Sequence, residues 1–223
     1  MTRVLIAGAT GRMGHVILPA LRAAADVEIV GTLVRGSDAP AVLGLAKPDV
    51  LLDFTCAEAS RELGLLAAER GISPVIGTSG LAEADVHSLR TACQRTKVGG
   101  LLVPNFSIGA VLQMRSAEAA ARHLPPVVVR ERHHPGKRDA PSGTARATAA
   151  RIDKVTSGSV PIESERRDGV VAEQDVVFEQ PGERLVLSHL VTDRRAYLPG
   201  ILLAVRSVRD LVGLHVGLDA LID

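Results

Sequence analysis

The chain concentrates its chemically useful side chains in one short segment, His133 to Ala145, which reads HHPGKRDAPSGTA. Two adjacent imidazoles, His133 and His134, are followed by the ammonium group of Lys137 and then by Ser142-Gly143-Thr144. Histidine can give up a proton near neutral pH, and lysine can neutralise an anion or act as an acid. The last three residues are typical of a helix start, where a hydroxyl caps the helix and free backbone N–H groups attract an anion. The segment therefore predicts a site for a negatively charged small molecule, with a proton donor beside it.

A more ordinary interpretation is a basic surface loop that leads into a capped helix, and a lone histidine or lysine would favour it. Val127 to Val129 predict a strand that ends at the two histidines and directs one imidazole to each face of a sheet. Two imidazoles, an ammonium group and an anion-attracting helix start occur together here. That combination favours the binding site over the surface loop.

Length and composition restrict the class of protein. The 223 residues allow one large domain or two small ones with a real core. A formal net charge of +1 and an aromatic content of 2% give no reason to expect nucleic-acid or membrane-surface binding. Cys56 and Cys93 are isolated and lack metal-ligand spacing, so we expect two reduced, buried thiols and no metal site. No apolar run approaches a membrane span and Met1 leads directly into a strand, which indicates a soluble cytoplasmic protein.

A second group of candidate residues lies near the N-terminus, where a strand, a glycine-rich turn and a helix follow each other. Arg3 to Ala7 is a short apolar strand, and residues 16–24 carry apolar side chains at helical spacing. Between them, Gly8 permits a tight turn, Gly11 lets the backbone approach a pyrophosphate, and Gly14 packs the helix against the strand. The spacing is G-x-x-G-x-x-G rather than G-x-G-x-x-G, and glycine loops also join strands to helices without binding a ligand. We predict a dinucleotide site here, formed by Gly8, Ala9, Thr10, Gly11, Arg12 and Met13.

The end of the second predicted strand, Val27 to Val34, indicates which dinucleotide is used. An acidic residue at this position commonly holds the adenine ribose hydroxyls. Here Arg35 comes first, and arginine suits a 2′-phosphate, with Arg12 able to stack or pair nearby. We therefore predict that NADPH is preferred and that NADH is possible, although the same residue could be an ordinary surface arginine.

Apolar strands continue to alternate with helices through the first half of the chain. Further strands are expected at 49–54, 73–76 and 100–103, with helices near 58–71 and 82–95 and one small helix within 36–48. This alternation predicts an α/β fold, a Rossmann-like doubly wound parallel sheet in which ligands bind beyond the carboxyl ends of the strands. Polar segments fall at those ends and extend the predicted cofactor site to Gly77, Thr78, Ser79, Pro104, Asn105, Phe106 and Ser107.

The second half of the chain reads differently. A helix over 107–123 precedes the strand and helix of the candidate site. Two strands, 170–178 and 184–192, are then joined by a hairpin turn, and His189 on the second of them is expected to be a packed core histidine. A last helix is predicted over Gly200 to Val212.

Residues 131–145, ERHHPGKRDAPSGTA, resemble the signature E-x-H-H-x-x-K-x-D-A-P-S-G-T-A of the dihydrodipicolinate reductase (4-hydroxy-tetrahydrodipicolinate reductase) family. The G-A-T-G-R-M-G, D-F-T, G-T-S-G and N-F-S-I-G segments are also similar to that family, so the resemblance covers nearly the whole chain, with shortened stretches at 36–48 and 151–170. It implies NAD(P)H-dependent reduction of 4-hydroxy-2,3,4,5-tetrahydrodipicolinate to tetrahydrodipicolinate and water, in lysine and diaminopimelate synthesis. The family often carries a Glu-Arg pair where this chain has Val34-Arg35, and the missing glutamate is a further reason to predict NADPH.

The same resemblance implies residue roles and a domain organisation. His133 is expected to be the general acid, and Lys137 to balance the anion or assist proton transfer. A substrate carboxylate is expected to be held by His134, Ser142, Gly143 and Thr144. Residues 1–106 and 198–223 are expected to form the dinucleotide-binding domain, and residues 107–197 a smaller α+β domain with an open mixed sheet for substrate binding and oligomerisation. The expected partners are a small dicarboxylate and further copies of the chain, in a homotetramer.

Two other functions remain open from the residues alone. One is a different two-domain amino-acid dehydrogenase, of the aspartate or homoserine type, although the intact H-H-x-x-K-x-D-A-P-S-G-T segment argues against it. The other is a non-catalytic nucleotide-sensing protein, which would require that the two shortened stretches have removed the productive site or its oligomer.

Overall fold

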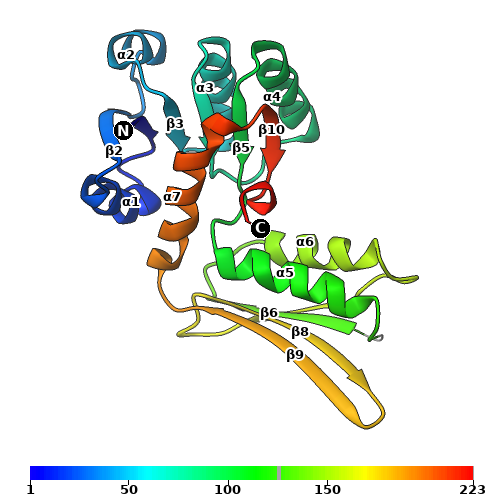
Figure 1. The fold of residues 1–223 in the computed structure, drawn as a ribbon. Helices are drawn as coiled ribbons and strands as arrows, with labels where there is room; N and C mark the ends of the chain where they lie inside the picture. Colours follow the sequence, from blue (N-terminus) through cyan, green and yellow to red (C-terminus); the bar gives the residue numbers. More distant parts are fainter. Residues whose placement is uncertain (125–126, 223) are drawn as a thin grey trace. The chain divides into compact units, whose positions relative to one another are not determined.

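The computed structural model describes residues 1–124 and 127–222 and divides into two compact units. The first unit contains Met1–Phe106 and Tyr197–Asp223, and the second contains Ser107–Ala196. Each unit is built around its own sheet (Figure 1). Among the described residues, no helix is both long enough and apolar enough to cross a membrane.

The first unit is a six-stranded parallel sheet in the order β10-β5-β4-β3-β1-β2. Its strands are β1 Thr2–Ala7, β2 Val27–Leu33, β3 Val50–Asp53, β4 Ser73–Ile76, β5 Gly99–Leu102 and β10 Gly213–Val216. The central strands are buried on both faces, which explains their nearly continuous apolar sequences. Because β2 and β3 lie on opposite sides of β1, the strand order reverses there. In such sheets ligands bind at that reversal, beyond the carboxyl ends of the strands.

Helices cover both faces of this sheet, as the alternation of strands and helices predicts. They are α1 Arg12–Ala23, α2 Ala39–Ala46, α3 Ala57–Glu69, α4 Glu83–Thr96 and α7 Leu198–Ser207. Helices α2, α3 and α4 pack side by side in one layer, and α1 contacts α7 in the other (Figure 1). Buried leucines such as Leu5, Leu43 and Leu51 join the first layer to the sheet. The predicted Rossmann-like fold is confirmed.

The C-terminal segment differs from its prediction as one long helix. Helix α7 ends at Ser207, a short 3-10 turn follows over Val208–Asp210, and the chain then enters β10, which pairs with β5. Gly213 starts that strand with a φ of 80°. This value lies outside the helical region, so the helix cannot continue through it. The predicted helix is therefore shorter than expected, and the residues that follow it, Gly213–Val216, supply the sixth strand.

The prediction that both thiols are buried is wrong for one of them. Cys93 is buried in α4, whereas Cys56 lies exposed at the residue before α3. Both cysteines are free.

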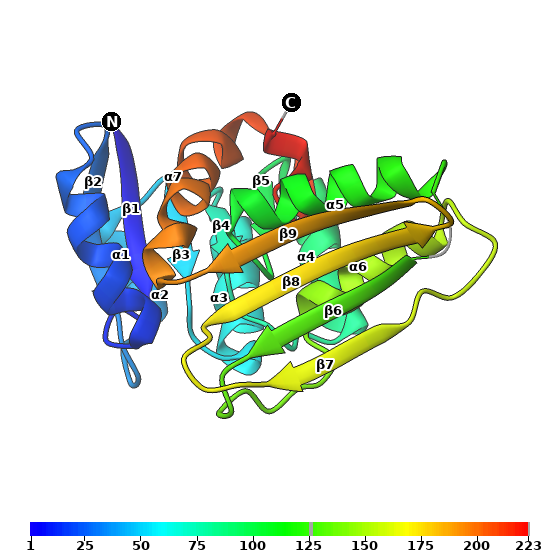
Figure 2. The same cartoon turned by 90° about the horizontal axis from the view of Figure 1, so that it is seen from below.

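The second unit is a four-stranded mixed sheet in the order β7-β6-β8-β9. Its elements are α5 Ile108–Ala121, β6 Val127–His133, α6 Gly143–Asp153, β7 Ile162–Arg166, β8 Ala172–Gln180 and β9 Glu183–Val191. Both helices lie on one face of the sheet, as Figure 2 shows, and pack on a core that includes Val129, Ile152 and Phe178. The predicted smaller domain with a mixed sheet is confirmed, as is the hairpin, whose turn is closed by the pairing of Gln180 with Glu183.

One strand of this sheet was not predicted. Strand β7, with the sequence IESER, pairs in parallel with β6 and brings Arg166 opposite His133. It carries no alternation of apolar and polar residues, because it is an edge strand whose three central residues are exposed. The candidate site depends on it, as described below.

Candidate active site

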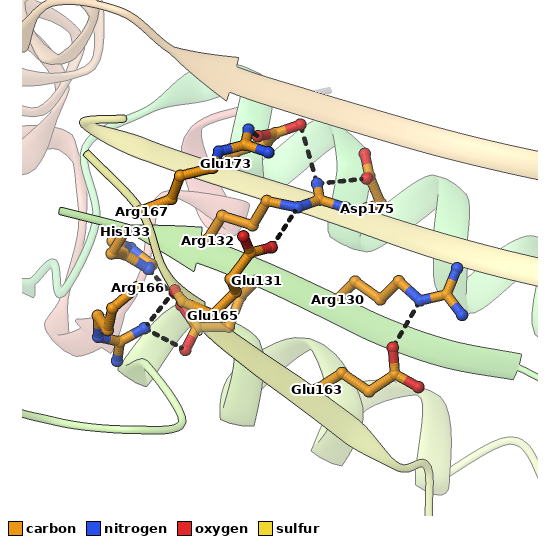
Figure 3. Close-up of polar contacts among 10 residues, drawn as sticks. All are labelled: Arg130, Glu131, Arg132, His133, Glu163, Glu165, Arg166, Arg167, Glu173 and Asp175. Atoms are coloured by element: carbon orange, nitrogen blue, oxygen red, sulfur yellow. Dashed lines mark hydrogen bonds and ion pairs between the residues drawn. The ribbon is translucent and has the colours of Figure 1, made fainter. Parts of the chain in front are cut away.

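Strand β6 sorts its side chains by alternation. Val129 and Glu131 are buried on the helix-covered side, while Arg130 and Arg132 lie on the other face. There the two arginines form ion pairs with Glu163 and Glu165 of β7 at 2.6 and 3.1 Å, and Arg132 also reaches two acidic residues of β8 (Figure 3). His133, two residues after Glu131, shares the inner side with it.

A buried carboxylate holds the imidazole of His133. The Glu131 side chain is fully buried, and its Oε2 contacts His133 Nδ1 in a short hydrogen bond. Its Oε1 accepts from Arg166 Nη1 at 3.2 Å. Burial acts to raise the pKa of Glu131, but hydrogen bonds from Ser164, Arg166 and His133 outweigh it and lower the pKa below its usual value. Glu131 is therefore ionised near pH 7, and it forms a hydrogen bond with one of the two ring nitrogens of His133, Nδ1.

His133 is held in an environment that favours its neutral form. Burial lowers the pKa of this imidazole, the charge of Glu131 acts in the opposite direction, and the cations Lys137 and Arg166 lower the pKa further. Because Nδ1 faces a carboxylate, Nδ1 carries the proton in the neutral ring and Nε2 is left for a ligand. A bound anion would raise the pKa of such a ring and allow it to take up the proton that an acid needs.

The loop after β6 carries the second predicted catalytic residue. A backbone hydrogen bond of 3.1 Å from Lys137 N to His134 O closes a turn, and the His134 ring lies against Gly136 at its tip. Lys137 Nζ forms an ion pair with Asp139 Oδ1 at 2.8 Å. This hydrogen bond from Lys137 is the main reason why the pKa of Asp139 lies below its usual value. The Lys137 side chain thus lies beside the Asp139 carboxylate, on the loop that follows His133.

Helix α6 begins as predicted, with Ser142 as its cap. The buried Ser142 Oγ accepts from Ala145 N at 3.1 Å, and Thr144 instead contributes its carbonyl to Thr148 Oγ1 at 2.8 Å. Gly143 is exposed, and a Cβ built on it would meet no atom within 4 Å. Helix geometry leaves the first backbone N–H groups without an acceptor inside the helix. The start of α6 therefore presents N–H groups beside open space, which is the arrangement that binds a carboxylate.

The glycine-rich turn of the first unit is built as predicted. Gly8 has a φ of 81°, and a Cβ on it would lie 2.6 Å from the carbonyl oxygen of Phe54. A Cβ on Gly14 would lie 2.1 Å from Ala9 O, so the first turn of α1 packs directly on the loop. The cap residue of α1, Gly11, has no side chain to occupy the N–H groups that follow it. Of the other predicted cofactor residues in this loop, Thr10 and Arg12 are exposed, Met13 is half-buried and Ala9 is buried.

Polar groups gather at the carboxyl ends of the neighbouring strands. Gly77 follows β4, and a Cβ on it would lie 2.3 Å from the ring of Phe54 and 2.8 Å from that of Phe106. Thr78 is buried and its Oγ1 has no hydrogen-bond partner among the described residues, whereas Ser79 next to it is exposed. A buried hydroxyl costs free energy unless it is paired, so this atom fits a ligand that approaches the same edge.

The remaining predicted cofactor residues fall in three places. Arg35 is exposed, in a turn closed by a bond of 3.0 Å from Ser37 N to Val34 O at the end of β2. Pro104 and Asn105 follow β5 in the first unit, the former exposed and the latter half-buried.

Ser107 belongs to the second unit instead, where its Oγ caps α5 and contacts His189 Nε2 at 3.0 Å. His189 is half-buried against this hydroxyl, and burial lowers its pKa, in agreement with its predicted role as a packed histidine.

Sequence reasoning missed two residues that shape these sites. Arg166 contacts Glu131 and the backbone of the loop after β6, but β7 gives no sequence signal for it. Asp53, at the end of β3, is fully buried and accepts from Thr55 N at 2.9 Å and from Thr55 Oγ1 at 2.7 Å. Burial raises the pKa of Asp53. It fixes the loop on which Gly8 rests, and a carboxylate directly after the apolar run VLL is the signal that could have found it.

Comparison with known proteins assigns the family. Residues 2–106 match the family profile described as dihydrodipicolinate reductase, N-terminus, and residues 109–221 match that described as dihydrodipicolinate reductase, C-terminus. The chain belongs to the dihydrodipicolinate reductase family. Members of this family are NAD(P)H-dependent, and the activity is reduction of 4-hydroxy-tetrahydrodipicolinate in lysine biosynthesis.

Individual relatives agree with the dihydrodipicolinate reductase assignment. The 4-hydroxy-tetrahydrodipicolinate reductase of Moorella thermoacetica is 37% identical over an alignment that covers 99% of this chain and 98% of that protein. The enzyme of the same name from Coxiella burnetii (strain RSA 493) is 36% identical over an alignment that covers 98% of each chain. A dipicolinate-bound dihydrodipicolinate reductase from Paenisporosarcina sp. TG-14 superposes with a TM-score of 0.89 at 28% identity over 100% of both chains.

The amino-acid dehydrogenase alternative receives much weaker support than the dihydrodipicolinate reductase family. An aspartate dehydrogenase from Thermotoga maritima superposes with a TM-score of only 0.54 at 12% identity, covering 93% of this chain and 96% of that one. A likeness at this level extends to the fold alone. The predicted reductase function is confirmed, and neither alternative function is needed.

Proposed function

We propose that the reduction takes place with His133 as general acid, on a dicarboxylate held at the start of α6, and with NADPH as the preferred electron donor. The observation that carries the proposal is the pairing of His133 with the buried Glu131 in the unit where Lys137 and the uncovered start of α6 also lie. An acid, a cation and an anion-binding helix start are the groups that this chemistry requires.

Charged and polar groups of the second unit explain how the substrate would bind. One carboxylate of the substrate accepts hydrogen bonds from the N–H groups and hydroxyls of Ser142, Gly143 and Thr144, with His134 beside them. The ammonium group of Lys137, now paired with Asp139, shifts toward the dianion, because an anion with two carboxylates offers it a stronger partner. The helix dipole of α6 adds to the attraction.

The proton comes from His133. A bound dianion raises the pKa of the imidazole, so that Nε2 gains a proton while Nδ1 stays on Glu131. Loss of water from the substrate leaves a conjugated imine, and reduced nicotinamide, when bound, would supply a hydride to the ring of that imine. His133 Nε2 then donates its proton to the neighbouring carbon, and Lys137 compensates the negative charge that remains.

The residues of the first unit fit a dinucleotide. Gly8 allows the turn, and the uncapped start of α1 offers N–H groups for a pyrophosphate. The buried Thr78 Oγ1, which has no hydrogen-bond partner among the described residues, can bond to the same ligand. The exposed guanidinium of Arg35 suits the 2′-phosphate that distinguishes NADPH from NADH.

The assembly that we propose is a homotetramer formed through the sheet of the second unit. The face of this sheet opposite its helices is uncovered by any element of its own unit among the described residues, and Val186 and Leu190 are 42% and 56% exposed there. Sedimentation equilibrium tests the proposal, and a monomeric mass would contradict it.

A direct assay tests the catalytic part. Freshly generated 4-hydroxy-tetrahydrodipicolinate is supplied with NADPH or NADH, and consumption of the reduced nicotinamide is followed by absorbance. We expect turnover with both donors and a lower KM for NADPH. Dipicolinate, the ligand of the Paenisporosarcina protein, serves as the binding probe. An equal or lower KM for NADH would contradict the donor preference, and dipicolinate affinity unchanged in His134→Ala and Ser142→Ala would contradict the carboxylate site.

A further inference from the structure

We infer that Glu131 and Arg166 are positioning residues for the reduction: Glu131 sets which ring nitrogen His133 presents to the substrate, and Arg166 ties that carboxylate to the loop that carries Lys137. This inference rests on the proposed role of His133. Neither residue has to touch the substrate. Both act through a side chain or a backbone segment that does.

The position of Glu131 on β6 makes the first contact unavoidable. Residues two apart on a strand point to the same side, so Glu131 and His133 are neighbours whenever β6 is formed (Figure 3). The carboxylate is fully buried and uses one oxygen on His133 Nδ1 and the other on Arg166. A buried carboxylate without either partner would strongly destabilise the folded protein, so the folded state favours the arrangement in which both contacts of Glu131 are made. Glu131 therefore holds the ring in one orientation and one tautomer.

Arg166 joins three parts of the site with one planar group. Besides Glu131, it donates from Nε to the carbonyl oxygen of Lys137 at 3.3 Å and from Nη2 to that of Asp139 at 2.5 Å. The parallel register of β7 with β6 places it opposite His133. A guanidinium has five N–H donors in a fixed plane, whereas an ammonium group cannot reach the same set of acceptors. Arg166 thus couples the carboxylate behind the acid to the backbone on either side of the Lys137–Asp139 ion pair.

The charges around His133 predict the direction in which its pKa changes when each neighbour is removed. Glu131 from β6 raises the pKa of the imidazole, while Lys137 from the loop and Arg166 from β7 lower it. On the remaining neighbour, β8, the residue paired with His133 is the uncharged Ala172. Loss of the carboxylate and loss of the guanidinium must therefore move the pKa of His133 in opposite directions. An opposite or like charge at such distances shifts a pKa by about 1 unit or more.

The test compares Glu131→Gln, Arg166→Met and Arg166→Lys by the pH dependence of kcat. Protonated His133 is required, so kcat falls on the alkaline side as the imidazole loses its proton. We expect this limb to move to lower pH by about 1 unit in Glu131→Gln and to higher pH by a similar amount in Arg166→Met. Above the pKa, the first shift alone reduces kcat about tenfold. Arg166→Lys keeps the charge, so its limb stays near that of the wild type while dipicolinate binds more weakly, because the two carbonyl contacts are lost.

A matched control comes from Glu118 on α5. It also contacts two arginines, Arg122 at 2.9 Å and Arg151 at 2.5 Å, and no histidine among the described residues. Glu118→Gln should leave the limb of kcat unchanged. If Glu131→Gln does not fold, the two Arg166 variants carry the comparison, since Glu131 remains in both. The inference would be overturned if the alkaline limb of kcat lay at the same pH in the wild type, Glu131→Gln and Arg166→Met. It would also be overturned if both variants shifted that limb in the same direction.

A readout that does not depend on turnover separates this inference from the proposed function. Nitrogen-15 NMR of the histidine rings, with His133 assigned by its absence in His133→Gln, reports the tautomer directly. We expect the proton on Nδ1 in the neutral wild-type ring and a mixture of tautomers in Glu131→Gln. A wild-type ring protonated on Nε2 would overturn the inference. Unchanged kcat in His133→Gln would refute the acid role, while the NMR result would still decide whether Glu131 sets the tautomer.

Discussion

Gly143 offers a test in which stability and binding should change in opposite directions. A Cβ at this position would meet no atom of the described residues within 4 Å, and the φ of Gly143 lies outside the left-handed region. Gly143→Ala therefore fits the folded chain without strain. By restricting the unfolded chain, such a substitution stabilises a protein by about 0.4–1 kcal/mol. For a chain of this size that corresponds to a rise in Tm of about 1–4 °C.

Binding should suffer from the same methyl group. If a substrate carboxylate rests on the start of α6, the open space beside Gly143 is the space that the ligand fills, and the added Cβ displaces it. A hydrogen bond to a charged group contributes about 1.5–3 kcal/mol. Loss of one such bond weakens binding by about 10- to 100-fold. We expect this loss in the Kd of dipicolinate and in the KM of the substrate.

Calorimetric titration with dipicolinate and a thermal melt measure both effects on one sample. Gly44→Ala is the matched control, because Gly44 lies exposed within α2 and its Cβ would also meet no atom within 4 Å. It should raise Tm by a similar amount and leave the Kd of dipicolinate unchanged. If Gly143→Ala binds dipicolinate as tightly as Gly44→Ala does, the carboxylate does not rest on the start of α6.

Four further outcomes are expected. His133→Gln should reduce kcat by about 10²- to 10⁴-fold with little effect on the Kd of dipicolinate, and kcat within threefold of wild type would remove this residue from the acid role. Arg35→Ala should raise the KM for NADPH about tenfold and hardly change that for NADH, whereas equal changes would show that the guanidinium does not read the 2′-phosphate. Burial raises the pKa of Cys93 to about 11, so a thiol reagent near pH 8 should modify only the exposed Cys56 in the folded protein and both thiols after unfolding. Gly8→Ala should lower the free energy of unfolding by more than about 1 kcal/mol, because the positive φ and the Phe54 carbonyl both exclude a side chain, and an unchanged denaturation midpoint would contradict this.

The sequence predicted those parts of the site that are contiguous in the chain. The spacing from His133 to Ser142 places a strand end, a turn and a helix cap in order, and each of these is local geometry. The link from Glu131 to Arg166 could not be predicted in the same way. It joins residues 35 apart, and it depends on β7 pairing with β6. Strand β7 is polar and exposed along its centre, so no hydrophobic period marks it.

The fold shows the same division between local and long-range information. Strands such as β3 and β4 are continuous apolar runs and were predicted to within a residue or two. The last strand was not, because its four residues GLHV come after the helix predicted over Gly200 to Val212 and are too few to show a clear strand period. What places GLHV in the sheet is the backbone conformation at Gly213 and the free edge of β5, and the second of these exists only once the sheet has formed.

Side chains along β6 point alternately to the two faces of the sheet, with a period of two residues. Its odd-numbered positions from Val129 to His133 carry the acid and its carboxylate, and its even-numbered positions carry the arginine ladder. Insertion of a single residue ahead of Glu131 would exchange the two sets, turning guanidinium groups into the apolar interior and the imidazole out of it. Changes in chain length are therefore better tolerated in the connections than within β6, and most of the shortened stretch between Arg151 and Val170 lies in the connections on either side of β7.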